Sequence, residues 1–190
     1  MTYSRQIVLK NGNTALLRNA EPSDAGAVLE NFSLTHAETD YLLTYPDEST
    51  FDAEREACFL QRKAESANEI EIIAVADGRV VATAGVDAVG TRDKLRHRAE
   101  FGVSVLRAYW GLGLGRALTE ASIQCAKEAG YEQLERPSSR RTNGRLRCTG
   151  RRGLSNSGAI PADSAPGRAD TRRSFTCCWR CNGRPSCISA

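Results

Sequence analysis

The sequence predicts an α/β domain built on a sheet of mixed strand pairing. Three observations predict it. Apolar periodicity gives the order strand, helix, helix, three strands, helix, strand along residues 14–135. The dipeptide Asp77-Gly78 separates two apolar runs, which is the strongest short signal for a β-hairpin. A glycine-rich loop, Gly111–Gly115, stands between a strand and a helix.

The first half of the chain supplies one strand and two helices. Residues 14–19 (TALLRN) are expected to form the strand. Ser23 is the expected N-cap of the first helix, whose apolar face is formed by Ala25, Val28, Leu29 and Phe32. Thr50 is expected to cap a second helix that runs to about Ser66.

The second half supplies the remaining strands. Residues 70–76 and 80–86 form the hairpin around Asp77-Gly78, and residues 98–106 form the next strand. The helix that opens at Gly111–Gly115 ends at Gly130, a usual C-terminal position for glycine. Residues 131–135 begin another strand.

The loop Gly111–Gly115 has the composition of a phosphate site. Glycine lets the backbone approach a ligand closely, and the start of a helix adds unpaired N–H groups and the positive end of a dipole. Together they favour a phosphate or diphosphate. A dinucleotide fingerprint would need glycine where Arg116 or Leu118 stands, and the Gly-Lys-Ser/Thr of a nucleotide P-loop is absent.

This loop resembles the signature of the GNAT superfamily of N-acetyltransferases, Gln/Arg-x-x-Gly-x-Gly/Ala. The segment from Trp110 to Gly115 matches it except at the first position, where Trp110 stands. The likeness covers about residues 5–135. It implies the GNAT (acyl-CoA N-acyltransferase) fold, a mixed, mostly antiparallel sheet flanked by helices. It also implies acetyl-CoA as co-substrate and an amine as acceptor.

The resemblance implies a set of cofactor-binding residues. The backbone of Val103 and Val105 would pair with the pantetheine arm as an added strand, and the N–H of Val105 or its neighbour would donate to the oxyanion. The diphosphate would lie on Gly111 to Arg116. The residues expected to bind acetyl-CoA are Val103, Ser104, Val105, Gly111, Leu112, Gly113, Leu114, Gly115 and Arg116.

Glu100 is the candidate general base, because many family members keep a glutamate on this strand and amide formation needs a neutral amine. By strand alternation it shares a face with Ser104. A structural ion pair with Arg98 or Arg96 is the alternative interpretation, and His97 is a second candidate base.

Tyr41 and Tyr45 lie where the family's variable acceptor loop falls, and they are candidate substrate-binding residues. Tyrosines that cap a core are the alternative interpretation.

Charge divides the chain at Glu135. Residues 136–190 contain 12 Arg and two Asp, a net charge of +10, whereas residues 1–135 contain 14 basic and 21 acidic residues, a net charge of −7. The tail has no Val, Glu or Lys and contains five of the seven cysteines. We therefore expect an incomplete GNAT domain over 1–135 and a disordered Arg/Ser/Cys-rich tail over 136–190, with the family's C-terminal strands missing.

A changed reading frame would explain the tail. Joining the third base of each codon from Glu135 onward to the first two bases of the next allows the peptide ASVVAENERAVALYR with permitted synonymous codons. That peptide resembles the strand and helix that the family places here. The family's general acid, a Tyr, would then overlap Cys148 and Thr149, so we expect weak turnover or none.

Other site types and locations are less well supported. Cys178 and Cys181 form a C-x-x-C, but no second pair with zinc-knuckle spacing exists, so no metal site is predicted. No apolar run is long enough to cross a membrane and the N-terminus has no apolar signal core, so a cytoplasmic protein is expected.

Two functions remain open. The first is acetyl transfer to the primary amine of a small molecule or of a protein N-terminus. The alternative is a non-catalytic acyl-CoA-binding remnant whose Arg-rich tail binds nucleic acid, although nucleic acid is the less expected partner. A homodimer is left open.

Overall fold

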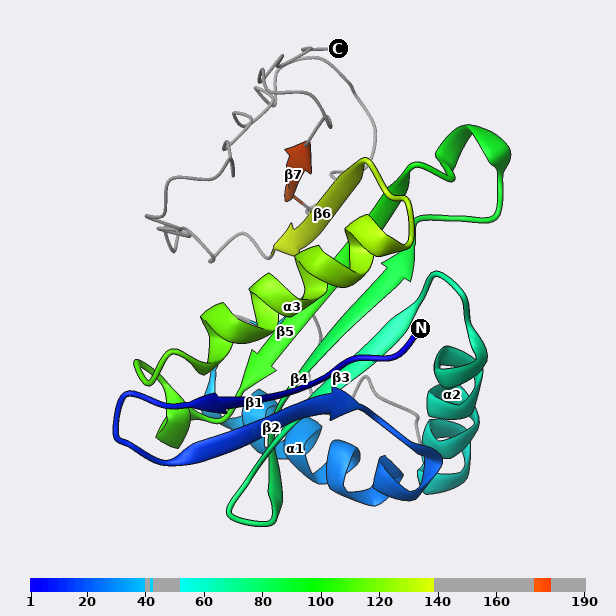
Figure 1. Cartoon of the computed structure of the whole chain (residues 1–190). Helices are drawn as coiled ribbons and strands as arrows, with labels where there is room; N and C mark the ends of the chain where they lie inside the picture. The colour runs from blue at the N-terminus through cyan, green and yellow to red at the C-terminus, as the bar shows by residue number, and fades with distance from the viewer. Residues whose placement is uncertain (40–41, 43–51, 139–172, 179–190) are drawn as a thin grey trace, which may run out of the picture.

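Helices flank a twisted sheet on both faces in the computed structural model, which describes residues 1–39, 42, 52–138 and 173–178 (Figure 1). The strands of this described part are β1 (Ser4–Val8), β2 (Thr14–Asn19), β3 (Ile70–Ala76), β4 (Arg79–Ala88), β5 (Arg98–Val105), β6 (Gln133–Ser138) and β7 (Arg173–Cys178). The helices are α1 (Ala25–Glu38), α2 (Ala53–Glu65) and α3 (Leu114–Glu128), with short 3-10 turns η1 (Pro22–Asp24), η3 (Asp93–Leu95) and η4 (Arg107–Tyr109).

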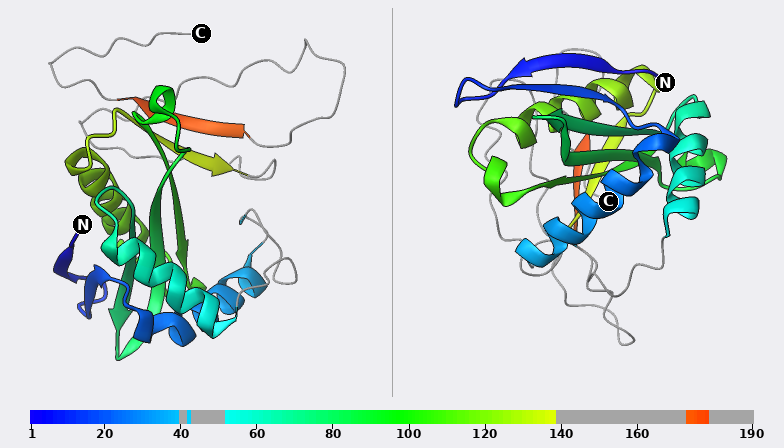
Figure 2. Two further views of the ribbon diagram at one scale, coloured as in Figure 1. Left: turned by 90° about the vertical axis from the view of Figure 1, so that its right-hand side faces the viewer. Right: turned by 90° about the horizontal axis from the view of Figure 1, so that it is seen from below.

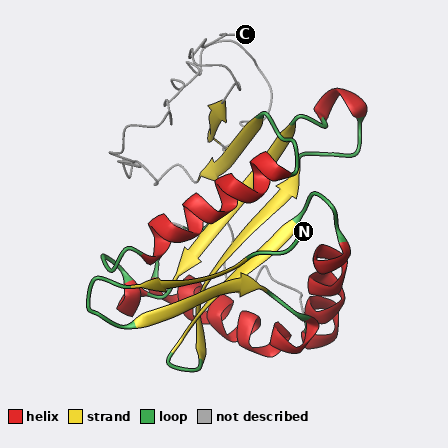
Figure 3. Cartoon of the chain, in the orientation of Figure 1, coloured by secondary structure: helices red, strands yellow, loops and turns green. Residues whose placement is uncertain are grey.

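The strands lie in the order of the chain, from β1 to β7. Every neighbouring pair is antiparallel except β5 and β6, which are parallel. Parallel neighbours need a crossover connection, and α3 supplies it across one face of the sheet (Figure 3). The mixed, mostly antiparallel sheet expected from the sequence is therefore confirmed.

Strand alternation divides the core between the two faces. On one face Ile70 and Ile72 of β3 pack in the same cluster as Leu114 and Leu118 of α3. On the other face Ile73 packs with Leu60 of α2. The views in Figure 2 show α3 on the side of the sheet away from α1 and α2.

The hairpin between β3 and β4 turns as the sequence predicts. Asp77 has φ 51° and Gly78 has φ 75°, and positive φ at both central residues is what a type I′ turn requires. Gly130, with φ 84°, follows the C-cap residue Ala129 of α3. The N–H of Tyr131 bonds the carbonyl of Ala126 there, which is the 6→1 bond of a Schellman C-cap.

Three local features differ from the expectation. β1 was not predicted, because most of its residues are exposed and its sequence lacks clear alternation. The N-cap of α1 is Asp24 and not Ser23, since η1 intervenes before the α-helix begins. The N-cap of α2 is Asp52, whose carboxylate accepts from the N–H of Arg55 at 2.8 Å. The expected cap Thr50 lies outside the described residues.

The tail contributes one strand to the described structure. β7 pairs with β6 in antiparallel register from Gln133↔Cys178 to Ser138↔Arg173. We expected the sheet to lack its C-terminal strands, so the pairing of β7 with β6 was not predicted. Residues 139–172 and 179–190 lie outside the described part of the chain.

Candidate active site

The sheet opens between β5 and β6. β5 pairs with β4 from Ala99 to Val105, but it pairs with β6 only over Arg98, Ala99 and Glu100. Beyond Glu100 the edge of β5 that faces β6 has no ladder partner in β6. A strand edge of this kind presents free backbone donors and acceptors.

The backbone groups on that open edge belong to odd-numbered residues. The N–H of Leu106 bonds the carbonyl of Val81, so even-numbered positions point toward β4. The carbonyl of His97 accepts from the N–H of Gln133, on the opposite side. Because backbone groups alternate along a strand, the N–H groups of Val103 and Val105 point into the opening.

The glycine loop closes one end of this opening. Gly111 has φ 76°, and Gly113, the N-cap of α3, has φ 95°. A Cβ added at either residue would meet no heavy atom within 4 Å, so glycine is required there by its φ and not by crowding within the protein. The first α3 bond runs from the N–H of Ala117 to the carbonyl of Gly113. The N–H groups of residues 114–116 precede it and have no intrahelical acceptor.

The opening and the loop together line a cavity of about 510 Å³. Its walls come from β5, from the segment that leads into α3, from the loop after β1, and from the end of α1. The lining residues are Lys10, Thr35, Thr39, Leu42, Val103, Ser104, Val105, Tyr109, Trp110, Gly111, Gly113, Gly115 and Arg116.

Seven of the nine residues expected to bind the cofactor line this cavity, namely Val103, Ser104, Val105, Gly111, Gly113, Gly115 and Arg116. The side chain of Leu114 is fully buried in the core. Leu112 is half-buried, and its carbonyl accepts from the N–H of Lys10 at 3.1 Å. Leu112 and Leu114 therefore anchor the loop with their side chains and can offer only backbone groups to a ligand.

Lys10 and Trp110 line the cavity although sequence analysis did not assign them to the site. Lys10 is about a hundred residues from the loop, so no local motif marks it. The indole Nε1 of Trp110 donates to the carbonyl of Val105 at 2.7 Å. Trp110 thus ties the loop to the end of β5 and occupies an acceptor on the open edge.

Arg116 lines the cavity at the first turn of α3, and its Nε donates to Glu120 at 2.9 Å. Ser104 lies on the opposite face of β5 from Val105, and its hydroxyl is 3.0 Å from that of Thr83. The cavity therefore combines a backbone edge, a cationic helix start and the hydroxyl of Ser104.

Glu100 is exposed and does not line the cavity. It shares its face of β5 with Ser104, about 13 Å further along the strand. The expected alternative partner, Arg98, instead pairs with Glu135, with Nη2 and Oε1 2.6 Å apart. Tyr41 and Tyr45 lie outside the described residues. The backbone carbonyl of His97 holds the start of β6.

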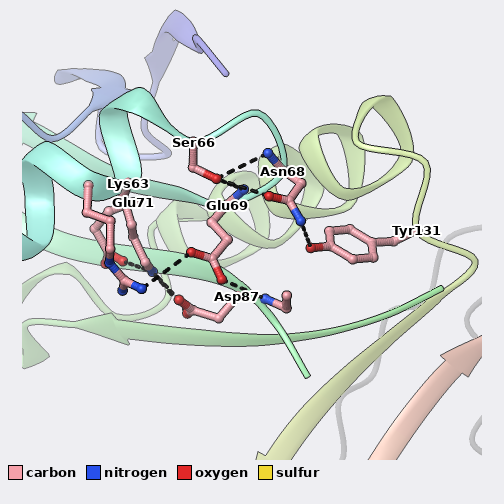
Figure 4. A network of polar contacts seen from close by, with 9 residues as sticks. Lys63, Ser66, Asn68, Glu69, Glu71, Asp87 and Tyr131 are labelled. Carbon is pink, nitrogen blue, oxygen red and sulfur yellow. Dashed lines mark hydrogen bonds and ion pairs between the residues drawn. The ribbon is translucent and has the colours of Figure 1, made fainter. Parts of the chain in front are cut away.

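A buried lysine joins α2 to the same face of the sheet (Figure 4). The ammonium of Lys63 is 2.9 Å from Glu71 of β3 and 2.8 Å from Asp87 of β4, and its side chain is 1% exposed. Burial lowers the pKa of Lys63, but the charges of Glu71 and Asp87 outweigh that effect and hold its pKa above the ordinary value. Lys63 therefore stays protonated at neutral pH.

The described residues show no group of three or more His, Cys, Asp or Glu side chains placed to hold a metal ion. Among the helices of that part of the chain, none has the length and apolarity needed to cross a membrane.

The sequence was compared with protein-family models and with curated proteins. The sequence model of the Acetyltransferase (GNAT) family matches residues 33–140, which is more than half of the chain. No curated protein matches the sequence.

Solved structures resemble the chain over most of its length. An acetyltransferase of the GNAT family from Streptococcus pneumoniae is 23% identical, with a TM-score of 0.72 over 85% of this chain and 96% of its own. The GNAT domain of S. lividans PAT is 18% identical, with a TM-score of 0.69 over 93% and 97%. A putative acetyltransferase, yncA, from Salmonella typhimurium, solved with its cofactor acetyl-CoA, is 18% identical with a TM-score of 0.70 over 92% and 99%.

Proposed function

Because this chain belongs to the acetyltransferase (GNAT) family, we propose that it transfers the acetyl group of acetyl-CoA to a primary amine. The acceptor is the amine of a small molecule or of a protein N-terminus. The observation that carries the proposal is the cavity between the open edge of β5 and the start of α3. One of the similar structures was solved with acetyl-CoA.

The residues of this cavity fit the chemistry of coenzyme A. A diphosphate needs N–H donors and positive charge, which the first turn of α3, Arg116 and Lys10 supply. The pantetheine arm carries amides that can pair with a free strand edge, and Val103 and Val105 present such an edge.

The neutral amine would attack the carbonyl carbon of the acetyl thioester, the C–S bond would break, and coenzyme A would leave as a thiolate that takes its proton from water. The N–H of Val105 would donate to the thioester carbonyl oxygen as negative charge develops there. Glu100 lies on the same face of β5 as Ser104 but does not line the cavity. It would therefore take the proton of the amine through a water molecule.

Binding and transfer should be measured separately. We expect acetyl-CoA to raise the melting temperature of the full chain and to titrate in calorimetry with one site. A thiol-release assay with a panel of small amines and N-terminal peptides then tests transfer, and Glu100→Gln should abolish any rate that is found. Absence of acetyl-CoA binding would contradict the proposal.

The alternative function rests on the composition of the tail. A net charge of +10 over residues 136–190 favours contact with a polyanion. If the chain is a non-catalytic remnant that binds nucleic acid, random duplex DNA should bind with strong salt dependence. A variant with the tail arginines of residues 139–172 changed to Gln should lose that binding and keep its affinity for acetyl-CoA.

A further inference from the structure

Three carboxylates lie in register across the sheet. Asp87 of β4 is the Cα partner of Glu100 of β5, and Glu100 is the Cα partner of Glu135 of β6. Directly paired residues point to the same face of a sheet, here the face toward α1 and α2. Like charges directly opposite one another destabilise a sheet, so this row needs compensation.

Each outer carboxylate of the row has a cation of its own. Asp87 is 2.8 Å from the ammonium of Lys63, which comes from α2. Glu135 is 2.6 Å from the guanidinium of Arg98, which comes from β5. Each pair has one buried member, because the side chains of Lys63 and Glu135 are 1% and 5% exposed, whereas those of Asp87 and Arg98 are 45% and 33% exposed.

The central carboxylate has no ion pair within the described residues. Arg98 lies two positions before Glu100 on the same face of β5, within reach of its side chain. Nevertheless both Nε and Nη2 of Arg98 are 2.6 Å from Oε1 of Glu135. Arg98 therefore pairs with Glu135 on the neighbouring strand β6, and not with Glu100 on its own strand.

We propose that Glu135 is a positioning residue that holds Arg98 away from Glu100, so that the Glu100 carboxylate stays free to accept a proton. On the other side of Glu100, the ammonium of Lys63 neutralises the Asp87 carboxylate. The inference rests on the proposed function, because it assigns Glu135 a role in the site where Glu100 acts as base.

The charged groups in and behind the row come from five elements. β5 supplies Arg98, β6 supplies Glu135, and β4 supplies Asp87. Behind Asp87, α2 supplies Lys63, which also contacts Glu71 of β3. None of the variants changes a residue of the Lys63 cluster, so we expect its effect on Glu100 to cancel in the comparison.

The test measures the Glu100 carboxyl directly, without acetyl-CoA or amine. The full chain is labelled with ¹³C-glutamate, the Glu100 signal is assigned with Glu100→Gln, and its titration is followed by NMR. In Glu135→Gln the released Arg98 should pair with Glu100. The titration midpoint should then move to lower pH by at least about one unit. In the double variant Arg98→Gln/Glu135→Gln the midpoint should return to the wild-type value.

The Glu135 carboxylate is buried, so loss of its charge alone also lowers the midpoint, by about half a unit for a unit charge about 6 Å away in water and by about two units at an effective dielectric constant of about 20. Pairing is therefore identified by a new NMR contact between the Arg98 and Glu100 side chains, which should accompany the shift in Glu135→Gln, and absence of that contact overturns the inference. A shift below one unit in Glu135→Gln, or a shift that persists in the double variant, overturns the inference. Glu135→Asp keeps the charge and should retain the wild-type midpoint.

If Glu135→Gln does not fold, Arg98→Gln provides the measurement. It leaves Glu135 as a bare anion beside Glu100, so the midpoint should rise, and no rise overturns the inference. The two proposals fail separately. A chain that binds no acetyl-CoA contradicts the proposed function and leaves these titrations unaffected, whereas unchanged titrations contradict only the role of Glu135.

Discussion

At the residue scale, the backbone conformation of Gly113 matters most to the cavity. It is the N-cap of α3 with φ 95°, a region that costs a residue with a Cβ about 1 to 2 kcal/mol. That conformation turns the chain into α3, whose first residues Gly115 and Arg116 line the cavity. Glycine is needed at this position because of its positive φ and not because of crowding, since an added Cβ would meet no atom within 4 Å.

Gly113→Ala is therefore expected to weaken acetyl-CoA binding about tenfold, which corresponds to about 1.4 kcal/mol. Strain should also lower the free energy of unfolding by about 1 kcal/mol. Calorimetric titration and thermal unfolding measure the two effects. Gly26→Ala is the control, because Gly26 lies in α1 with open space and no positive φ. Equal binding by both variants would contradict the assignment.

Cys125 and Cys58 should differ in reactivity. Burial in α3, followed by the charge of Glu128, raises the pKa of the Cys125 thiol to about 11. Little thiolate forms there at pH 8, and the thiolate is the reactive form. Cys58 is exposed on α2.

We expect a thiol reagent at pH 8 to modify Cys58 at least ten times faster than Cys125 in the native chain. Peptide mapping by mass spectrometry after short exposure measures both rates. The difference should vanish in denaturant, and comparable native rates would show that α3 is not packed as described.

At the element scale, α2 is fixed to the sheet through Lys63, and Gly85 makes room for it. A Cβ at Gly85 would stand 2.6 Å from Oε2 of Glu71 and 3.0 Å from Nζ of Lys63. The ammonium is buried, so its partners have little freedom to move aside. The docking of α2 thus depends on a missing side chain in β4.

Gly85→Ala should lower the free energy of unfolding by about 1 to 3 kcal/mol through overpacking. Gly102→Ala is a matched control, because Gly102 is the Cα partner of Gly85 on β5 and has no atom within 4 Å of the added Cβ. Chemical denaturation compares the two. Similar losses in both variants would argue against the packing around Lys63.

Asp24, at the start of α1, should make the free energy of unfolding depend on pH. The hydrogen bond from Arg18 lowers the pKa of Asp24 below its ordinary value of 3.8, against the effect of burial. A folded-state pKa that is lowered stabilises the protein above the unfolded pKa, and this stabilisation is lost as pH falls through the folded value.

Asp24→Asn should therefore cost about 1 to 2 kcal/mol at pH 7. The difference from wild type should shrink as the pH falls below 3.8. Denaturation curves at several pH values measure it. A difference that does not change with pH would show that the Asp24 charge contributes nothing.

At the scale of the whole molecule, the domain and its tail have opposite net charge, and β7 of the tail completes the edge of the sheet beside β6. We propose that the reading frame changes near Glu135. The family's general acid would then be absent, so the departing thiolate would lack its proton donor.

Sequencing of the gene across the codons for Leu134 to Arg140 should reveal a single-base insertion or deletion relative to the restored frame. The chain as printed should turn over at least a hundred times more slowly than the frame-restored protein, the low end of a general acid's contribution. A thiol-release assay on both proteins measures the ratio. Full activity of the present chain, or an unbroken frame in the gene, would refute this hypothesis.

The sequence by itself determined the order of elements, the hairpin at Asp77-Gly78 and the glycine loop before α3, because these depend on local periodicity and on residues with special φ. It could not determine the helix caps, since Asp52 and Asp24 compete with neighbouring residues that cap equally well. Only the tertiary structure placed Lys10 beside the loop, tied Trp110 to Val105, and committed Arg98 to Glu135. Some of these contacts join segments that are far apart in the chain, and in others a side chain has more than one partner within reach. In each case the packing of the sheet decides which contact forms.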